Sequence, residues 1–519
     1  MSQQQQGFSM PMYKDFVPEK LRFWITMLFP LIFQMSDALF MGLSGPISAT
    51  TPLTQNDVLF CGFCGMAGVV VTFPILFRLK FRFTTRQILL TVSLGMVLCN
   101  MICLNTTFMP ILALTNFVFG ILKLWGSFEC FSSIMMKVSP HYNFAPFLAV
   151  VFTTVFGGIE LSGIVSGHII YSLPWQYVNY LMMGLQMMLA LMAFVLMRDI
   201  RLMPLNRLYG ISWIGLFLWG LFWCAFNFIF VYGDQIQWFK SPYTHVAIGI
   251  MAVTLSTLVY RMFHYRHPYI EFQSFRYRNL WNILMLFFIA ALMMSTESVL
   301  HHIFTDEVLR YGSLSTANLK WWVIAGIALG GVFSVVAIER WHWGYKSLTL
   351  ICVCSLTVYV ALMTFAISPQ TPIRYFFLPM LLYGVGHVMI FIVLTTYVEG
   401  VVPLQHRFQV LAILGFVRIG PGSAVGSALC GHLFKLEMAR NIDVLGAHVN
   451  ATAFRQYDFG VIANEVVENA MMLSLRNLYG LTATVGIVTM LLLLASRFQP
   501  QIKNTIPTLK RAYKTFSKK

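Results

Sequence analysis

The sequence is dominated by apolar segments of about 20 residues, which recur from Phe23 to Arg497 with short gaps between them. A helix needs about 20 mostly apolar residues to cross the hydrocarbon core of a bilayer. The composition agrees, because 58% of the residues are hydrophobic, only 10% are charged and the mean hydropathy is +0.72. A soluble chain carries about 25% charged residues. The sequence therefore predicts an all-α polytopic membrane protein.

Fourteen segments fit this description, and an even number places both termini on one side of the membrane. The predicted spans are 23–43, 57–77, 87–107, 110–136, 145–172, 177–197, 209–231, 244–263, 279–300, 319–338, 347–367, 374–398, 408–434 and 474–496. They divide the chain into an N-terminal six-helix bundle (1–205), two additional transmembrane helices (206–268) and a C-terminal six-helix bundle (269–519). The last part includes an outer loop at 435–473 and a basic cytosolic tail.

The distribution of Lys and Arg predicts the orientation. If the N-terminus is cytosolic, 25 of the 35 basic residues fall in inner segments and eight in outer segments. Short cytosolic loops are enriched in Lys and Arg, so both termini are expected in the cytosol and the protein in the cell (inner) membrane.

The first apolar run is too long for a cleaved signal. The net charge of +16 fits contact with an anionic lipid bilayer, and its scatter over many loops argues against a nucleic-acid partner.

Several short motifs occur in the order found in one transporter family. They are Asp37 followed by Pro46, Trp175 to Tyr180, Gly233 to Trp238 followed by Ser241 and Pro242, His267 to Ile270, Phe275 to Asn279, and Phe416 to Gly426. Together they resemble motifs of the major facilitator superfamily, in particular its 14-helix drug:proton antiporter branch (EmrB/QacA type). The resemblance implies a major facilitator fold of two six-helix bundles plus two extra helices.

The same resemblance implies a function. It points to a secondary active transporter that exports small apolar or cationic compounds in exchange for protons, by alternating access and without a cofactor or bound metal. A carrier for another solute, such as a metabolite or siderophore, and a non-transporting membrane protein are the alternatives. No hydrolase or phosphate-binding motif argues for an enzyme. The sequence leaves open whether a periplasmic adaptor and an outer-membrane channel join the protein.

Three positions depart from the family pattern. The predicted cytosolic gate loop carries Arg78, Lys80, Arg82 and Arg86, but it lacks the family's glycines and has Phe81 in place of the acid. Asn116 stands where the fourth span of the family has an arginine. The segment 162–167 lacks the proline of the antiporter motif. These changes bear on the gate and on the proton path.

Charged residues inside the predicted spans are the main functional candidates. An ionisable residue at the bilayer centre costs roughly 2.5–3.5 kcal/mol on insertion scales, so it needs a partner or a function. The proton-coupling candidates are Asp37, Glu129, Glu160 and Glu297, and the buried cations are Lys123 and Arg418. The alternative for each is a structural polar contact between helices.

Aromatic side chains supply candidates for the substrate cavity. Aromatic residues and Met adapt to varied ligands, and this chain has 31 Met and 46 Phe. The cavity candidates are Trp125, Phe128, Phe156 and Trp219. The alternative is that these residues pack against other helices or face lipid.

Overall fold

The computed structural model describes residues 12–80, 82–139, 144–200, 211–265, 268–277, 280–449 and 459–495. Within these ranges the regular structure is helical, apart from an isolated bridge between Tyr13 and Met197. The predicted basic tail lies outside the described residues, as do residues 450–458 of the predicted outer loop and the boundary at 205–206.

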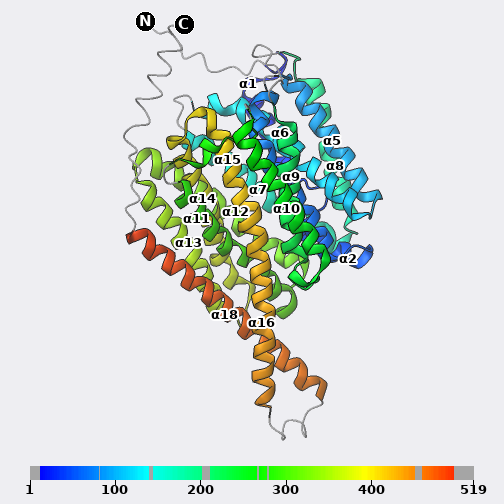
Figure 1. Ribbon diagram of the computed structural model, residues 1–519, viewed down its shortest axis with the longest axis vertical. Helices are drawn as coiled ribbons and strands as arrows, with labels where there is room; N and C mark the ends of the chain where they lie inside the picture. Colours follow the sequence, from blue (N-terminus) through cyan, green and yellow to red (C-terminus); the bar gives the residue numbers. More distant parts are fainter. Residues whose placement is uncertain are drawn as a thin grey trace.

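The helices follow the order expected from the apolar segments (Figure 1). The first half contains α1 (Glu19–Met35), α2 (Ser44–Thr50), α3 (Gln55–Thr72), α4 (Leu76–Lys80), α5 (Thr85–Asn105), α6 (Met109–Val138), α7 (Phe144–Ser172) and α8 (Gln176–Leu196). The two additional helices are α9 (Trp213–Tyr232) and α10 (Pro242–His264). The second half contains α11 (Leu280–Thr296), α12 (Ser313–Val335), α13 (Tyr345–Ala366), α14 (Phe377–Val401), α15 (Leu404–Val417), α16 (Val425–Ala447) and α18 (Phe459–Ala495).

Short π-helical segments extend or join several of these helices. They are η5 (Glu297–His301) and η6 (Ile303–Val308) after α11, η7 (Val336–Arg340) after α12, and η9 (Arg418–Ala424) between α15 and α16. Among the described residues, thirteen helical segments are long and apolar enough to cross a membrane. The helix α1 has 17 residues, slightly fewer than a full span needs.

The two halves have the same packing pattern. In the first half α3 packs on α6, and α5 packs on both α6 and α8. In the second half α12 packs on α14, and α13 packs on both α14 and α18. The two bundles meet along α7 and α12, which lie side by side near the middle of the molecule (Figure 1). The expectation of two six-helix bundles is therefore confirmed.

Glycines permit the closest helix contacts in both halves. A Cβ atom at Gly120 of α6 would clash with the carbonyl oxygen of Gly65 on α3. In the second half, a Cβ atom at Gly384 of α14 would clash with the carbonyl oxygen of Val323 on α12. Small residues allow this close approach where no hydrophobic effect pulls helices together in lipid.

The first predicted span is a broken helix, contrary to the continuous span expected at 23–43. The helix α1 ends at Met35, and a short 3-10 helix, η1 (Met41–Leu43), precedes α2. Asn116 Oδ1 accepts a hydrogen bond from the Leu39 amide at 3.2 Å, and Asn179 Nδ2 donates to the Ala38 carbonyl at 3.0 Å. These side chains satisfy backbone groups that lipid cannot, which is how a membrane protein tolerates a break.

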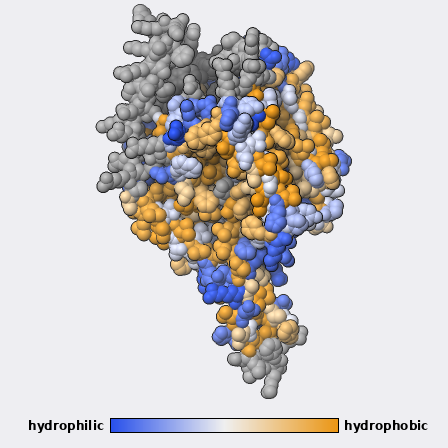
Figure 2. Space-filling model, viewed as in Figure 1, coloured by the Kyte–Doolittle hydropathy of each residue, from blue (hydrophilic) through white to orange (hydrophobic). Residues whose placement is uncertain are grey.

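The predicted outer loop at 435–473 is largely helical. The helix α16 continues to Ala447 and α18 begins at Phe459, so the two helices project beyond the bundles (Figure 1). On the visible face of Figure 2, apolar side chains dominate the middle of the molecule, and hydrophilic ones gather toward both ends. This distribution matches a protein that crosses a bilayer.

The additional helices α9 and α10 pack on the side of the bundles. The helix α9 contacts α3 and η9, whereas most α10 side chains face outward. Asp234, in the loop that joins α9 to α10, accepts hydrogen bonds from Lys435 Nζ at 2.8 Å and His432 Nδ1 at 3.0 Å. This contact ties the added pair to α16.

Candidate functional site

An ion pair joins the two bundles at the α7–α12 interface. Lys320 Nζ on α12 lies 3.2 Å from Glu160 Oε2 on α7, and Glu160 is only 8% exposed. Glu297, in η5, is close enough for its charge to act on both residues. Lys320 is thus paired with a carboxylate of the other bundle, and the carboxylate of Glu297 in its own bundle lies within electrostatic range of both.

The position of Lys320 corrects the charge count from which the orientation is predicted. That count places Lys320 among the outer-segment residues, but α12 begins at Ser313 and carries this lysine into the interface. Opposite it, a Cβ atom at Gly163 would lie 2.6 Å from Lys320 Nζ. The absence of a side chain at Gly163 thus leaves room for the lysine to reach Glu160.

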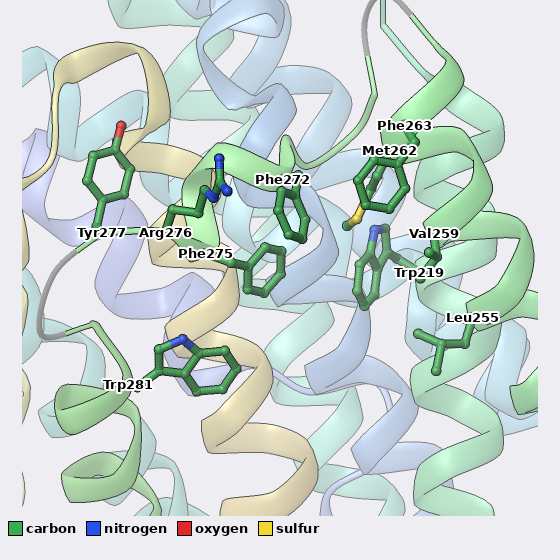
Figure 3. A pocket seen from close by; sticks show the side chains of 10 residues that line it. All are labelled: Trp219, Leu255, Val259, Met262, Phe263, Phe272, Phe275, Arg276, Tyr277 and Trp281. Atoms are coloured by element: carbon green, nitrogen blue, oxygen red, sulfur yellow. The ribbon is translucent and has the colours of Figure 1, made fainter.

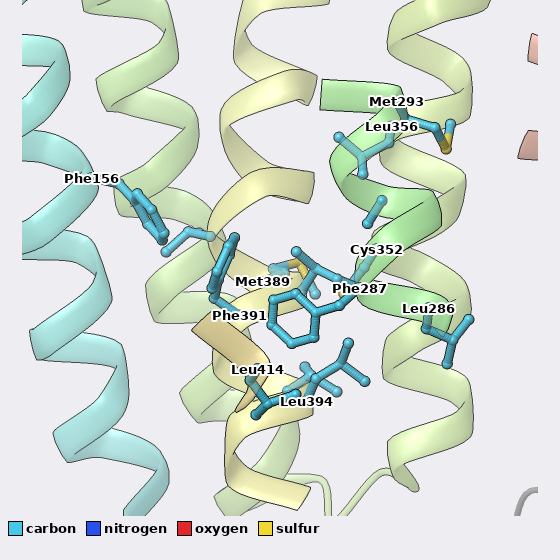
Figure 4. Close-up of a cluster of buried hydrophobic side chains, with 14 of the residues drawn as sticks. Phe156, Leu286, Phe287, Met293, Cys352, Leu356, Met389, Phe391, Leu394 and Leu414 are labelled. Atoms are coloured by element: carbon cyan, nitrogen blue, oxygen red, sulfur yellow. The ribbon is translucent and has the colours of Figure 1, made fainter. Parts of the chain in front are cut away.

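A second group surrounds Arg418, the first residue of η9. The Arg418 guanidinium carbon lies 5.0 Å from the ring centroid of Phe156 and 4.7 Å from that of Phe391. Figure 4 shows these two rings close together within the apolar cluster, with Phe287 beside them. Phe156 is four residues before Glu160, so both groups lie on one face of α7.

The Arg418 group contains two polar side chains that lack a partner. No ion pair in the described part of the chain involves Arg418. The ring centroid of His387 of α14 lies 4.3 Å from that of Phe156, with the rings tilted by 41°, and its buried Nδ1 atom has no hydrogen-bond partner among the described residues. Buried polar groups are nearly always hydrogen-bonded, so the buried Nδ1 atom of His387 is an exception that needs an explanation, and the half-buried Arg418 beside it lacks a counter-ion within the described ranges.

Asp37 belongs to a different pair. Its Oδ1 atom lies 2.9 Å from Lys123 Nζ of α6, within the first bundle. The Lys123 side chain is 9% exposed and that of Asp37 47% exposed. Asp37 lies at the break after α1, a location at which carriers often bind ions or substrates. The structure pairs the two candidates with each other and not with Glu160.

Glu129 holds the predicted gate loop. Thr85 Oγ1, at the start of α5, donates to Glu129 Oε1 at 2.6 Å, and Lys80 Nζ lies 3.8 Å from the same oxygen. Burial lowers the pKa of Lys80, although the charge of Glu129 opposes this effect. Arg86 lies 4.8 Å over the Phe194 ring. Arg78 and Arg82 take part in no ion pair among the described residues.

The four aromatic candidates are not brought together. Phe156 lies in the Arg418 group, whereas Trp125 packs against Phe83 of the gate loop. Phe128 contacts Phe408 of α15, across the two bundles. Trp219 stacks on Phe416 and also lines an outward-facing groove.

That groove has a volume of about 840 Å³ and lies between α9, α10 and the segment that leads into α11 (Figure 3). Its lining is apolar apart from Arg276 and the polar atoms of Trp219, Tyr277 and Trp281. Phe263 and Trp281 are each 62% exposed, so the groove opens at the outer surface of the protein, and neither Glu160 nor Lys320 lines it.

Sequence reasoning missed Lys320 and the unpartnered state of His387. A signal for Lys320 does exist, because residues 313–319 can begin a helix one turn or more before the apolar run that the span prediction detects. No sequence signal shows which acid the lysine meets, because that depends on how the bundles pack.

Comparisons with known proteins find similarity at the level of structure. No protein-family model and no curated protein matches this sequence. A variant of the nucleoside transporter NupG superposes with a TM-score of 0.54 and 11% identity, over 92% of this chain and 99% of that one. The major facilitator superfamily proton:xylose symporter XylE superposes with a TM-score of 0.50 and 13% identity, over 94% and 98%.

A human protein shows the same likeness. The organic anion transporter MFSD10 (TETRAN) superposes with a TM-score of 0.51 and 12% identity, over 92% of this chain and all (100%) of that one. Identities this low establish the arrangement of helices and not the substrate. Together with the apolar helices, they show that this chain is a multi-pass membrane protein with the major facilitator fold.

Proposed function

We propose that this protein is a secondary active transporter that couples proton movement to the movement of a small organic compound by alternating access. The observation that carries the proposal is the Glu160–Lys320 pair, which bridges α7 and α12 with Glu297 beside it. In carriers with two repeats, one bundle rocks against the other around a fixed central site. Rocking at this interface changes the distance between the two charges.

The charge balance of this cluster supports proton coupling. When both carboxylates are ionised, Glu160, Glu297 and Lys320 carry two negative charges and one positive charge, so one added proton makes the cluster neutral. When α7 and α12 separate, Glu160 loses its counter-ion in an environment of low dielectric constant, where an unpaired charge is costly. Protonation of the carboxylate removes that cost. Proton binding and bundle separation are thereby linked.

The other candidates take supporting roles in this proposal. Asp37 and Lys123 form a second charge pair at a broken helix, where a proton or substrate group can enter. Glu129 and Lys80 fasten the gate loop to α6 on the side predicted to be cytosolic. We propose that the protein works in the cell (inner) membrane with both termini in the cytosol.

Two substrate classes compete within the proposal. The resemblance to the EmrB/QacA type favours export of apolar or cationic compounds. A carrier for another solute, such as a metabolite or siderophore, is the second candidate, and Arg418 favours it because this unpaired cation repels a cationic compound. Proteins that share the fold are named as transporters of xylose, nucleosides and organic anions.

Proteoliposomes that contain the purified protein and a pH-sensitive dye test the coupling. We expect an imposed pH gradient to drive uptake or release of ethidium or 1-naphthoate, together with a change in internal pH. Glu160→Gln should abolish both changes, whereas Glu437→Gln, in the projecting part of α16, should leave them intact. If the wild-type protein moves each compound equally fast with and without the pH gradient, proton coupling is contradicted.

A further inference from the structure

The Arg418 guanidinium is an interior cation that has no counter-ion among the described residues. Of the two acids on neighbouring elements, Glu160 is paired with Lys320, and the charge of Glu297 acts on the same lysine. An unpaired charge inside a membrane protein is expensive, and such residues generally mark a ligand or ion pathway. We propose that Arg418 binds the carboxylate of the transported compound, whose apolar or aromatic body lies against Phe156 and Phe391. This inference rests on the proposed function and narrows it toward its second candidate.

The two phenyl rings hold the guanidinium in a fixed environment. They lie 5.0 Å and 4.7 Å from the guanidinium carbon, within the range of a cation–π interaction. Ring faces attract the cation but accept none of its N–H groups as strong hydrogen bonds. The donors of Arg418 therefore remain available, and the planar guanidinium fork matches a carboxylate by two parallel hydrogen bonds.

His387 supplies a second polar group at the same place. Its ring lies 4.3 Å from Phe156 and 5.7 Å from Phe391, and it lies within the electrostatic range of Arg418. Its buried Nδ1 atom has no partner among the described residues. A bound carboxylate has lone pairs left after pairing with Arg418, and a neutral imidazole that carries its hydrogen on Nδ1 can donate to one of them.

The backbone at Arg418 is also unusual. Residues 418–424 form the π-helical segment η9, and such segments occur frequently at functional sites. Pro421 in this segment has no amide N–H, so it cannot make an ordinary α-helical hydrogen bond. The widened turn places the guanidinium beside α7 of the other bundle, where it contacts Phe156. A ligand at this position touches both bundles.

Equilibrium binding of radiolabelled 1-naphthoate tests the inference without any transport step. The full-length protein is placed in lipid nanodiscs at pH 7 with no gradient, and 1-naphthamide serves as the uncharged analogue of the same shape. We expect the wild-type protein to bind 1-naphthoate about tenfold to a hundredfold more tightly, the range for hydrogen bonds to a charged group. Arg418→Gln should abolish this preference, and Arg418→Lys should retain part of it.

Two further variants control for a loss of binding that is caused by misfolding. Arg476→Gln removes a cation on α18 that donates to the Ile367 carbonyl, and it should leave the preference unchanged. If Arg418→Gln does not yield folded protein, Phe391→Leu keeps the cation but removes one ring, and it should weaken binding of 1-naphthoate more than that of 1-naphthamide. Equal affinity for the two compounds in the wild-type protein overturns the inference, as does a preference that survives Arg418→Gln or one that Phe391→Leu leaves undiminished.

The result is separable from a failure of the proposed function. A carboxylate preference without gradient-driven transport supports the Arg418 inference and contradicts only the proposed coupling. Gradient-driven transport without a carboxylate preference supports the coupling and contradicts only the role of Arg418.

Discussion

At the scale of single residues, the Glu160–Lys320 pair predicts which of two variants, Lys320→Met or Glu160→Gln, is the less stable. Lys320→Met leaves two neighbouring carboxylates without their ammonium group, whereas Glu160→Gln leaves Lys320 with Glu297. We therefore expect Lys320→Met to lower the melting temperature of the purified protein more than Glu160→Gln. Breaking a fully buried pair costs about 3–5 kcal/mol. The loss here should be smaller, because the Lys320 side chain is 36% exposed.

The double variant Glu160→Gln/Lys320→Met separates stability from function. Removing both charges should recover part of the lost melting temperature, because only one carboxylate, that of Glu297, is then left without the ammonium group, and not two. Gradient-driven transport should stay absent. Arg440→Gln is the control, since it removes a pair with Glu437 in which the arginine is 76% exposed. A double variant that is less stable than either single variant would contradict a mutual stabilisation of the two residues.

The sequence predicted the acids of this site better than their partners. A charge inside a long apolar run stands out without any structure, which is why Glu160 and Glu297 are recognisable as candidates. Lys320 lies at the edge of such a run and resembles a loop residue. Lys320 and Glu160 lie 160 residues apart in the sequence. Their pairing depends on how the two bundles pack, and no local sequence pattern encodes that contact.

At the scale of helices, close packing predicts a contrast between two glycines. A side chain at Gly120 would clash with the backbone of α3, which cannot move away as a flexible side chain can. A Cβ atom at Gly157 of α7 would meet no neighbouring helix within 4 Å. We expect Gly120→Ala to cost at least about 1–3 kcal/mol and Gly157→Ala to be neutral or slightly stabilising. Thermal unfolding of the purified variants in detergent measures both, and equal losses would contradict the α3–α6 contact.

The loop contact of Asp234 predicts a dependence on pH. Partial burial alone would raise the pKa of Asp234, but hydrogen bonds from Lys435 and His432 outweigh it and hold the pKa below its usual value. An acid with a depressed folded-state pKa stabilises the protein above its unfolded pKa, and the contribution disappears as the pH falls through the folded value. Asp234→Asn should thus lower the melting temperature at pH 7, and the difference should shrink below about pH 4. A difference that stays constant from pH 7 to pH 3 would contradict this role.

The break after α1 shows why helix boundaries were harder to predict than helices. The segment around Asp37 is apolar enough to indicate one continuous span, and its sequence holds no strong helix breaker between Asp37 and Gly42. The hydrogen bonds that make the break tolerable come from Asn116 on α6 and Asn179 on α8. In the sequence, Asn116 stands out only as a departure from the family's arginine. Its contact with the broken segment depends on how the helices pack.

At the scale of the whole molecule, the two bundles share a packing pattern that the apolar segments could not reveal. The apolar segments predicted the membrane spans, and the family resemblance implied two six-helix bundles. The structure adds the matching contacts of α3 with α6 and of α12 with α14. It also replaces most of the predicted outer loop by the projecting ends of α16 and α18 (Figure 1). Mixed charges lowered the hydropathy there without preventing helix formation.

The orientation of the molecule in the membrane remains a prediction from charge, and fusion reporters can test it. Basic residues gather in alternate loops, and moving Lys320 into α12 leaves this asymmetry large. Reporters fused after Arg207, Arg278 and Lys519 should all report the cytosol, and one near Asn450 should report the outside. Each fusion should be compared at equal expression with a reporter of the opposite compartment at the same site. An outside signal at Lys519 together with cytosolic signals at Arg207 and Arg278 would mean an odd number of crossings and would remove the fourteen-span arrangement.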